Sequence, residues 1–307
     1  MPPVSSPIDL SHARARVQPG IFGPPPAHAL SLELRLAPGA LADDGALRAR
    51  LQSLPLAGPG SSPVVGLGTT LLDALGLKPA GMHDLAPIGG GNGGFVATQA
   101  DLWLLVPSDS AGAAFERATG LLALLEPAFL PSEATALFRY RDGRDLTGFR
   151  DGTENPTGDA AVAAAVLCEG ALAGGSFAMV QRFVHRHGPF SRLPVAQQSL
   201  VIGRERESDE ELDAAPASAH VKRTAQEDFD PAAFLWRRSM PWGTPLRHGL
   251  QFIAFMAELD RADRMLRKMA GQHDGITDAL LTYTQAETGA YYFCPPCDGG
   301  RLALARS

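Results

Sequence analysis

The stretch Gly148-Phe149-Arg150-Asp151-Gly152-Thr153-Glu154-Asn155-Pro156 joins the Asp151 carboxylate to two glycines and a closing proline in a segment too polar for a core. Glycine lets the backbone turn tightly and approach a flat ligand closely. Proline fixes its own φ angle and biases the preceding residue towards an extended conformation, so the segment cannot continue as a helix. We therefore expect a rigid loop that holds Asp151 in one direction. The alternative is a surface turn, because Asp-Gly is a common turn dipeptide.

Five other segments stand out along the chain: QPGI (18–21), QQSLVIGRER (197–206), AHVKR (219–223), WRRSMPWG (236–243) and the stretch 278–293. Together with GFRDGTENP they resemble, in the same order, the motifs of dye-decolorizing peroxidases, whose GxxDG signature is present here in a longer form. The matches extend from residue 18 to about residue 295, which is nearly the whole chain. By this resemblance the chain is identified as a member of the family's cytoplasmic bacterial branch.

Hydrophobic periodicity predicts a mixture of strands and helices in both halves of the chain. Apolar patterns predict strands at 29–36, 102–107, 177–184, 250–256 and 290–293, and helices at 40–54, 111–125, 259–269 and 279–283. We expect an α+β protein with two domains, each an antiparallel sheet covered on one face by helices. The charged stretch near 141–147 marks the join, which gives domains 1–145 and 146–307. The resemblance implies that both domains are ferredoxin-like and that the C-terminal half holds most of a haem.

Three segments predict irregular structure. Residues 1–27 are rich in proline and are expected to lie extended over the surface, and residues 207–218 are acidic and alanine-rich and predict an exposed loop. Residues 89–94 match GxGxxG, but no clear strand precedes them and no helix follows, and a dinucleotide fingerprint requires both. We expect a flexible connection there instead.

The composition limits the class of protein. The chain has 307 residues, 45% of them hydrophobic and 20% charged, which is ordinary for a globular protein. A net charge of −6 without a basic tract argues against nucleic acid as a partner. No apolar run approaches the roughly 20 residues that span a bilayer, and the N-terminal segment has no signal pattern or twin arginine. We expect a cytoplasmic protein with no membrane partner.

The resemblance implies haem b as the cofactor, and its iron needs an axial ligand, usually a neutral histidine nitrogen. The family pattern assigns this role to His220, although any of the eight histidines could be an ordinary surface or hydrogen-bonded residue. A ligating imidazole usually donates its other N–H to a carboxylate or carbonyl. Asp278 matches the family position for that partner, and its alternative role is a carboxylate at a helix start. Arg223 is implied to lie near a haem propionate.

The other face of the haem requires, by the same resemblance, Asp151 and an arginine. Alternation along residues 236–239 places Arg237 and Ser239 on one face of a strand and Trp236 and Arg238 on the other. The family motif assigns the haem-facing role to Arg237, with Ser239 where some members have asparagine. We expect Asp151 to move the proton of hydrogen peroxide and Arg237 to stabilise the charge on the departing oxygen. Arg238 is expected at the surface or at an interface.

Further residues are assigned to the haem edge. Arg204 matches a position that pairs with a propionate, and an arginine fork suits a carboxylate; its alternative is a surface ion pair. Asn155 and the backbone of Gly152, Thr153 and Glu154 are expected to line the haem as well.

A rival metal site is a pair of histidines. His185 and His187 share one face of a strand, but no carboxylate or cysteine lies nearby in sequence to complete a site.

The predicted function is a haem b peroxidase that reduces hydrogen peroxide and oxidises dyes or phenolics in one-electron steps. The alternatives are an enzyme that acts on haem or porphyrin itself and a non-catalytic haem-binding protein. The pair of Asp151 and Arg237 argues against the second, because a binder needs no acid–base pair. Tyr140, Trp236 and Trp242 offer a route for electrons from bulky donors, although packing is the commoner role of such aromatics.

Three further expectations concern the oligomeric state, packaging in a shell and the cysteines. The resemblance implies a homo-oligomer, a dimer or a larger ring. The tail at 299–307 could direct packaging in a shell protein, as in some relatives. Cys294 and Cys297 depart from the family pattern and are interpreted as incidental thiols, since the three cysteines form no disulfide framework.

Overall fold

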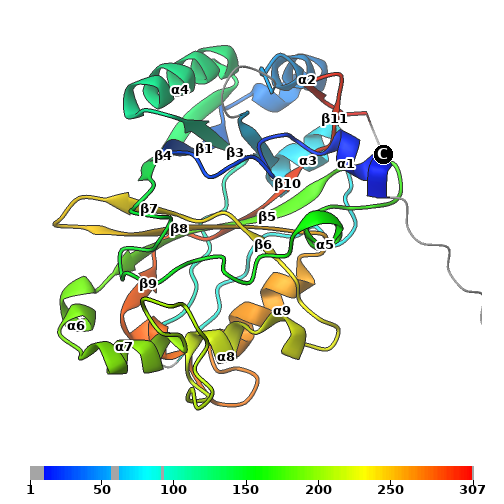
Figure 1. Cartoon of the computed structure of the whole chain (residues 1–307). Helices are drawn as coiled ribbons and strands as arrows, with labels where there is room; N and C mark the ends of the chain where they lie inside the picture. Colours follow the sequence, from blue (N-terminus) through cyan, green and yellow to red (C-terminus); the bar gives the residue numbers. More distant parts are fainter. Residues whose placement is uncertain (1–9, 57–61, 91–92, 306–307) are drawn as a thin grey trace, which may run out of the picture.

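The computed structural model describes residues 10–56, 62–90 and 93–305 (Figure 1). The strands are β1 (His28–Leu36), β2 (Val64–Leu67), β3 (Leu102–Ser108), β4 (Phe129–Phe138), β5 (Ser176–His185), β6 (Trp236–Arg237), β7 (Met240–Gly243), β8 (His248–Met256), β9 (Thr284–Ala286), β10 (Ala290–Cys294), β11 (Cys297–Asp298) and β12 (Arg301–Leu302). The α-helices are α1 (Leu10–Arg16), α2 (Asp44–Gln52), α3 (Thr69–Leu75), α4 (Ala111–Leu125), α5 (Gly158–Ala165), α6 (His187–Ser191), α7 (Val195–Ile202), α8 (His220–Thr224) and α9 (Asp260–Met269). Three short 3₁₀ helices are η1 (Ala40–Ala42), η2 (Gln226–Asp228) and η3 (Ala279–Thr282).

The strands of both halves form one continuous antiparallel layer. Its order runs β8-β7-β4-β1-β3-β2-β10-β5, and β5 pairs again with β8, so the layer closes into a ring. Each half is joined to the other by single residue pairs, Leu67 with Phe293 and Leu137 with Trp242. The expectation of a separate sheet for each half is therefore corrected, because the edge strands of one half pair with those of the other.

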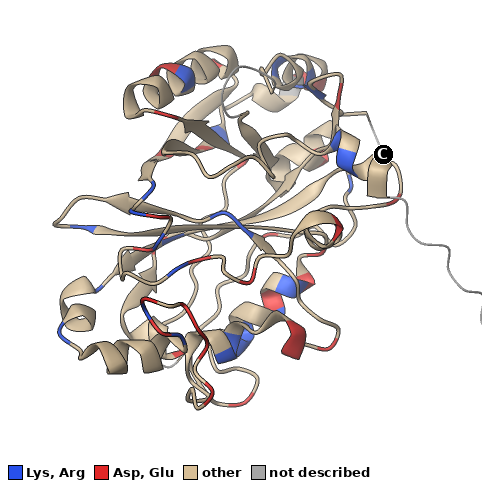
Figure 2. Ribbon diagram, in the orientation of Figure 1, with Lys and Arg blue, Asp and Glu red and all other residues tan. Residues whose placement is uncertain are grey.

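Alternation of side chains along the strands gives this layer an inner and an outer apolar face. Trp103, Phe255 and Tyr292 belong to the inner core, which the strands of both halves enclose. The outer face packs against helices: α2 and α4 on one side, in the upper part of Figure 1, and α9 on the other, in the lower part. Figure 2 shows basic residues on α8 and charges of both signs on α9 and the loops of that lower part, whereas the strands are mostly uncharged.

The predicted strands and helices are present, with shifted ends. The helix expected at 40–54 is divided at Asp43, whose side chain accepts a hydrogen bond from the Ala46 N–H and so begins α2. Residues 207–218 contain no helix or strand, as predicted. Among the described residues, every helix is too short or too polar to cross a bilayer.

The prediction that the N-terminal segment lies extended over the surface is wrong where the structure describes that segment. Residues 10–16 form α1, whose Ala13 is buried, and Gln18 and Ile21 are fully buried beyond it. Gln18 donates to the carbonyl of Val65 and accepts from its N–H, both at 2.8 Å, so it extends the pairing of β2. The part of this prediction that falls on residues 1–9 lies outside the described residues.

Candidate active site

A histidine and a carboxylate from distant parts of the chain form the floor of a cavity. His220 is the first residue of α8, and its Nδ1 lies 2.7 Å from Oδ2 of Asp278, which is fully buried. In the neutral ring, Nδ1 carries the proton that faces Asp278, and Nε2 carries the lone pair on the cavity side. Burial lowers the pKa of His220, but Asp278 raises it by more, so this pKa lies above its ordinary value.

Asp278 also begins η3. Its Oδ1 accepts a hydrogen bond from the Leu280 N–H at 2.9 Å, so the predicted partner of the histidine and the predicted helix-start carboxylate are the same group.

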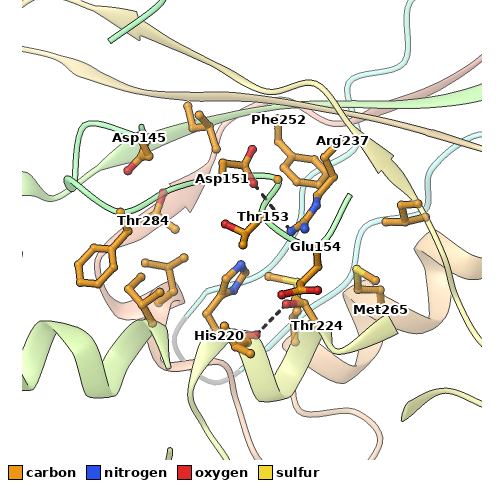
Figure 3. A pocket seen from close by; sticks show the side chains of 18 of the residues that line it. Asp145, Asp151, Thr153, Glu154, His220, Thr224, Arg237, Phe252, Met265 and Thr284 are labelled. Carbon is orange, nitrogen blue, oxygen red and sulfur yellow. Dashed lines mark hydrogen bonds and ion pairs between the residues drawn. The ribbon is translucent and has the colours of Figure 1, made fainter. Parts of the chain in front are cut away.

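A carboxylate and a guanidinium lie across the cavity from His220 (Figure 3). Oδ1 of Asp151 is 3.8 Å from Nη1 of Arg237, and the two side chains are 22% and 17% exposed. Nε of Arg237 is buried without a hydrogen-bond partner among the described residues. The side chains of Asp151, His220 and Arg237 therefore converge on one cavity, and a guanidinium N–H there is free to bind a further acceptor.

The loop that carries Asp151 is fastened to the strand that carries Arg237. Nδ2 of Asn155 donates to the Arg237 carbonyl at 2.7 Å, and the Arg237 N–H donates to Oδ1 of Asn155 at 2.8 Å. Gly152 makes the turn between them, with a φ of +78° that favours glycine. Asn155 thus aligns the loop with β6 and sets where Asp151 meets Arg237.

A second attachment of this loop was not predicted as part of the site. Asp145 accepts from Nε2 of His185 at 2.9 Å and from the hydroxyl and N–H of Thr147 at 2.6 and 2.9 Å. Burial raises the pKa of Asp145, but His185 and Thr147 together lower this pKa by more, so that it is about 2. Asp145 and His185 both line the cavity. The sequence placed Asp145 in the join and offered His185 only in a histidine pair that no carboxylate or cysteine nearby in sequence completes, and the spacing of 40 residues gave no signal that they meet.

Much of the remaining lining is apolar. A large part of it comes from one face of β5 and β8, from α9 and from one residue of the N-terminal half: Met179, Phe183, Leu250, Phe252, Met265, Met269 and Phe95. Alternation in the predicted strand 250–256 could have assigned Leu250 and Phe252 to this face.

Arg204 lies at the cavity edge, where it already has partners. Its Nη2 donates to Oε1 of Glu154 at 2.5 Å, and its Nη1 donates to the Asp209 carbonyl at 2.9 Å. Thr153 donates from its hydroxyl to Oδ2 of Asp209 at 2.6 Å. Gly152, Thr153 and Glu154 line the cavity, as expected.

Three residues lie elsewhere. Arg223 is buried away from the cavity, where it pairs with both oxygens of Asp274 at 2.7 Å and with the Lys268 carbonyl. Ser239 lines a second, neighbouring cavity, and its hydroxyl is buried without a partner among the described residues. Arg238, expected at the surface, is 5% exposed and donates to the carbonyls of Gly20, Ile21 and Pro24.

That second cavity adjoins the first. Both are lined by Arg150, Asp151, Gly152, Thr153 and Arg237, and Asn155 lines the second alone. Its other walls come from the chain around Tyr140 and Pro25.

The residues present fit the expected haem. One wall offers an imidazole whose Nε2 has a free lone pair, and a neutral imidazole nitrogen is a usual haem ligand. Much of the remaining lining is apolar, which suits a porphyrin, and the opposite wall carries a guanidinium with an N–H that has no partner among the described residues.

Comparison with known proteins gives consistent matches. The family described as Dyp-type peroxidase, C-terminal, matches residues 142–299. A dye-decolorizing peroxidase of Mycolicibacterium paratuberculosis is 33% identical over 247 residues, which are 77% of this chain and 70% of that protein.

Solved structures agree along nearly the whole chain. A DypB variant of Rhodococcus jostii RHA1 in complex with haem has a TM-score of 0.84 at 28% identity and covers 90% of this chain and 96% of its own. The encapsulated DyP-type peroxidase of Mycobacterium smegmatis has a TM-score of 0.82 at 30% identity and covers 92% of this chain and 96% of its own.

Proposed function

Because the chain belongs to the dye-decolorizing peroxidase family, it is a haem-dependent peroxidase, and we propose that His220, Asp151 and Arg237 form its active site. The observation that supports this assignment is the convergence of the three side chains on one cavity with apolar walls. The relatives are named peroxidases, which does not favour an enzyme that acts on haem itself or a mere haem binder.

In this proposal Nε2 of His220 holds the haem iron. Asp278 supports the role because its carboxylate fixes the imidazole ring and makes it a stronger donor. The haem supplies the two electrons that reduce hydrogen peroxide, and organic donors such as dyes and phenolics restore them one at a time.

The chain's own groups handle the proton and the charge. A carboxylate oxygen of Asp151 takes the proton from one oxygen of hydrogen peroxide and returns it to the other, which leaves as water. The free N–H of Arg237 stabilises negative charge on the departing oxygen. Asn155 holds both groups in register through the Arg237 backbone.

We assign Arg204 to a haem carboxylate, in exchange for part of its pairing with Glu154, whose side chain is 64% exposed. Glu154 can turn to solvent, so the fork of Arg204 becomes available. Arg223 and Ser239 are not assigned haem contacts.

We further propose that each half is a ferredoxin-like unit and that the C-terminal half holds most of the haem. The strand orders β4-β1-β3-β2 and β7-β8-β5-β10 support the first point, since each half runs strand, helical segment, two strands, helix, strand. The cavity walls support the second, because Phe95 is the sole contributor from the first 140 residues among those that line it.

Assembly and location remain predictions. The Mycobacterium smegmatis relative is described as encapsulated, which supports packaging of this chain in a shell protein. The homo-oligomer rests on the resemblance alone, and the cytoplasmic location stays a prediction.

The test is a haem titration followed by peroxide. The apo chain should give a Soret band on haem addition and a spectral change with hydrogen peroxide, followed by oxidation of a phenol or dye. His220→Ala should weaken haem binding at least about tenfold, whereas His248→Ala, on the far part of β8, should not. Equal haem affinity of the two variants would refute His220 as the ligand.

A further inference from the structure

His185 is a buried histidine of the cavity wall that the proposed proton transfer does not use. It is the last residue of β5, and its side chain is 7% exposed. Nε2 of its ring lies 2.9 Å from Oδ1 of Asp145, and Nδ1 lies 2.9 Å from Oγ1 of Thr284. Asp145 and Thr284 lie at the same end of the cavity, away from Met265 (Figure 3). Both ring nitrogens have partners, so the imidazole cannot turn without breaking a hydrogen bond.

Asp145 organises the start of the loop that carries Asp151. Its Oδ2 accepts from the N–H and the hydroxyl of Thr147. Its carbonyl accepts from the Gly148 N–H at 2.9 Å, and its own N–H donates to the Phe149 carbonyl at 2.9 Å. The position of Asp145 therefore sets the backbone as far as two residues before Asp151.

Thr284 ends a short segment that begins with Asp278. The carboxylate of Asp278 orients His220, η3 follows it, and Thr284 is the first residue of β9, which pairs with β5. His185 therefore connects the loop of Asp151 to the segment that orients His220 on the other side of the cavity.

Apolar contacts join the same two segments. Phe149 of the loop is buried with Phe190, and Leu280 and Tyr283 pack against this cluster. The ring of Phe190 lies 6.3 Å from that of Phe149 and 5.3 Å from that of Tyr283. Apolar packing keeps the segments together but is not directional. The two hydrogen bonds of His185 supply the direction.

We propose that His185 is a positioning residue for the reaction with peroxide, because it fixes Asp145 against Thr284 and thereby holds the carboxylate of Asp151 in place. This inference rests on the proposed function, in which Asp151 moves the proton of hydrogen peroxide. The loop is then held at both ends, by His185 at its start and by Asn155 at its end. The role requires no contact between His185 and peroxide.

The test is the rate at which haem-loaded variants react with hydrogen peroxide, followed by stopped-flow absorbance. We expect His185→Leu to slow this reaction by about 10- to 100-fold, because a displaced base transfers a proton poorly. Asp145 keeps its hydrogen bonds from Thr147 in this variant, so it is not left wholly unpaired. The matched control is His187→Leu, which should keep the wild-type rate. The ring of His187 contacts that of His248, at 5.3 Å, and its Nδ1 has no hydrogen-bond partner among the described residues.

A second background separates positioning from general damage. In Asp151→Asn the base is absent, so its position no longer matters, and adding His185→Leu should slow the reaction little further. A loss of similar size in both backgrounds would show that His185 acts on something other than Asp151, and it overturns the proposal.

Cyanide binding gives a readout that involves no turnover. Hydrogen cyanide gives up its proton when it binds to ferric haem, so its association rate depends on a correctly placed base. We expect His185→Leu to lower this rate at least about tenfold and His187→Leu to leave it unchanged.

Two conservative variants test the bridge itself. In Asp145→Asn the amide oxygen can still accept from Thr147, and the amide N–H can donate to Nε2 of His185 once the ring proton moves to Nδ1. This variant should therefore keep most of its rate, whereas Thr284→Val, which removes only the partner of Nδ1, should be slowed, though less than His185→Leu. A loss in Asp145→Asn as large as that in His185→Leu means that charge rather than position matters, and it overturns the proposal.

The Soret band of each variant reports whether it is folded and loaded. Wild-type rates in loaded His185→Leu overturn the positioning role, and if that variant does not load haem, wild-type rates in Thr284→Val do so. A wild type without a Soret band or a peroxide reaction overturns the proposed function itself.

Discussion

Asp278 is one carboxylate with two tasks, because its oxygens serve different groups. Oδ2 orients His220 and Oδ1 begins η3. An asparagine in its place still begins a helix well, since asparagine is among the best capping residues. The two tasks can therefore be separated by a substitution that removes only the charge.

We expect Asp278→Asn to weaken haem binding or turnover by about 10- to 100-fold without unfolding the protein, because the imidazole loses the carboxylate that strengthens it. Haem titration of the apo variant measures the affinity, and circular dichroism checks the fold. Asp274→Asn is the matched control, since Asp274 pairs with Arg223 rather than with His220. Equal affinity of the two variants would mean that the charge of Asp278 is irrelevant to haem.

Gly152 determines where the loop presents Asp151. A Cβ there would lie 3.1 Å from Nδ2 of Asn155, and the φ of +78° is strained for any other residue. We expect Gly152→Ala to slow the reaction with peroxide by about 10- to 100-fold, because Asn155 transmits the shift to Arg237 and such misplacement is costly.

Stopped-flow spectra of haem-loaded Gly152→Ala measure this rate. Gly158→Ala carries similar backbone strain, at a φ of +58°, but its Cβ would have open space and it lies outside the site. That control should lose about 1 to 2 kcal/mol of stability and keep its rate. If both variants react as fast as the wild type, the loop does not hold Asp151 as we infer.

At the scale of elements, Arg238 lies between β6 and β7 and fastens this part of the sheet to the N-terminal segment. Burial lowers the pKa of this guanidinium to about 10, so it remains charged at neutral pH. We expect Arg238→Met to lower the free energy of unfolding by about 3 kcal/mol, because three carbonyls, two of them in buried hydrogen bonds, lose their donor. Urea denaturation measures this.

Arg247→Met provides the comparison for that loss. Its side chain is 55% exposed and pairs with Glu287, so the expected change is within about 1 kcal/mol. A similar small change for Arg238→Met would show that the N-terminal segment contributes little to stability.

The sequence predicted those elements whose side chains alternate or repeat strongly. The helix at 111–125 is confirmed as α4, and the strand at 29–36 as β1 with one more residue. The strand β4 was missed because it contains Pro131 and exposes half of its residues, so its pattern is not apolar. Its length is fixed instead by pairing with β1, which no local pattern reveals.

The residues of the active site fall into the same two groups, those that a sequence pattern predicts and those that it does not. The motif residues Asp151, His220 and Arg237 line one cavity. The sequence could single them out because each lies in a segment with a distinctive pattern. Arg223 was misplaced because its position depends on Asp274, which lies 51 residues further along the chain. Arg238 was misplaced because a charged residue on a short strand usually faces water, and its three carbonyl acceptors lie more than 200 residues away.

At the scale of the whole molecule, the closed layer encloses a carboxylate. The pKa of Glu33 rises from its ordinary 4.5 to about 7 through burial and Glu133, so folding disfavours its ionised form. This disadvantage is absent below pH 4.5, where Glu33 is protonated in both states, and is complete above about pH 7. The wild type should therefore lose about 3 kcal/mol of stability to this group as the pH rises through that window.

We expect Glu33→Gln to lack this decline and to be more stable than the wild type at about pH 8, with a smaller difference at about pH 5. Urea unfolding at both values measures it. Glu258→Gln, whose side chain is 63% exposed, should follow the wild type. Parallel stability curves for Glu33→Gln and the wild type would contradict a buried, ionisable Glu33.

The closure of the strand layer has a consequence for synthesis on the ribosome. The outer strands of the first half, β2 and β4, pair with β3 and β1 on one edge, and their other edges are covered by β10 and β7. Since β10 ends at residue 294, the nascent chain keeps an unpaired strand edge exposed at least until that residue has been made. Production of this protein should therefore depend on chaperone capacity and growth temperature more than its final stability suggests.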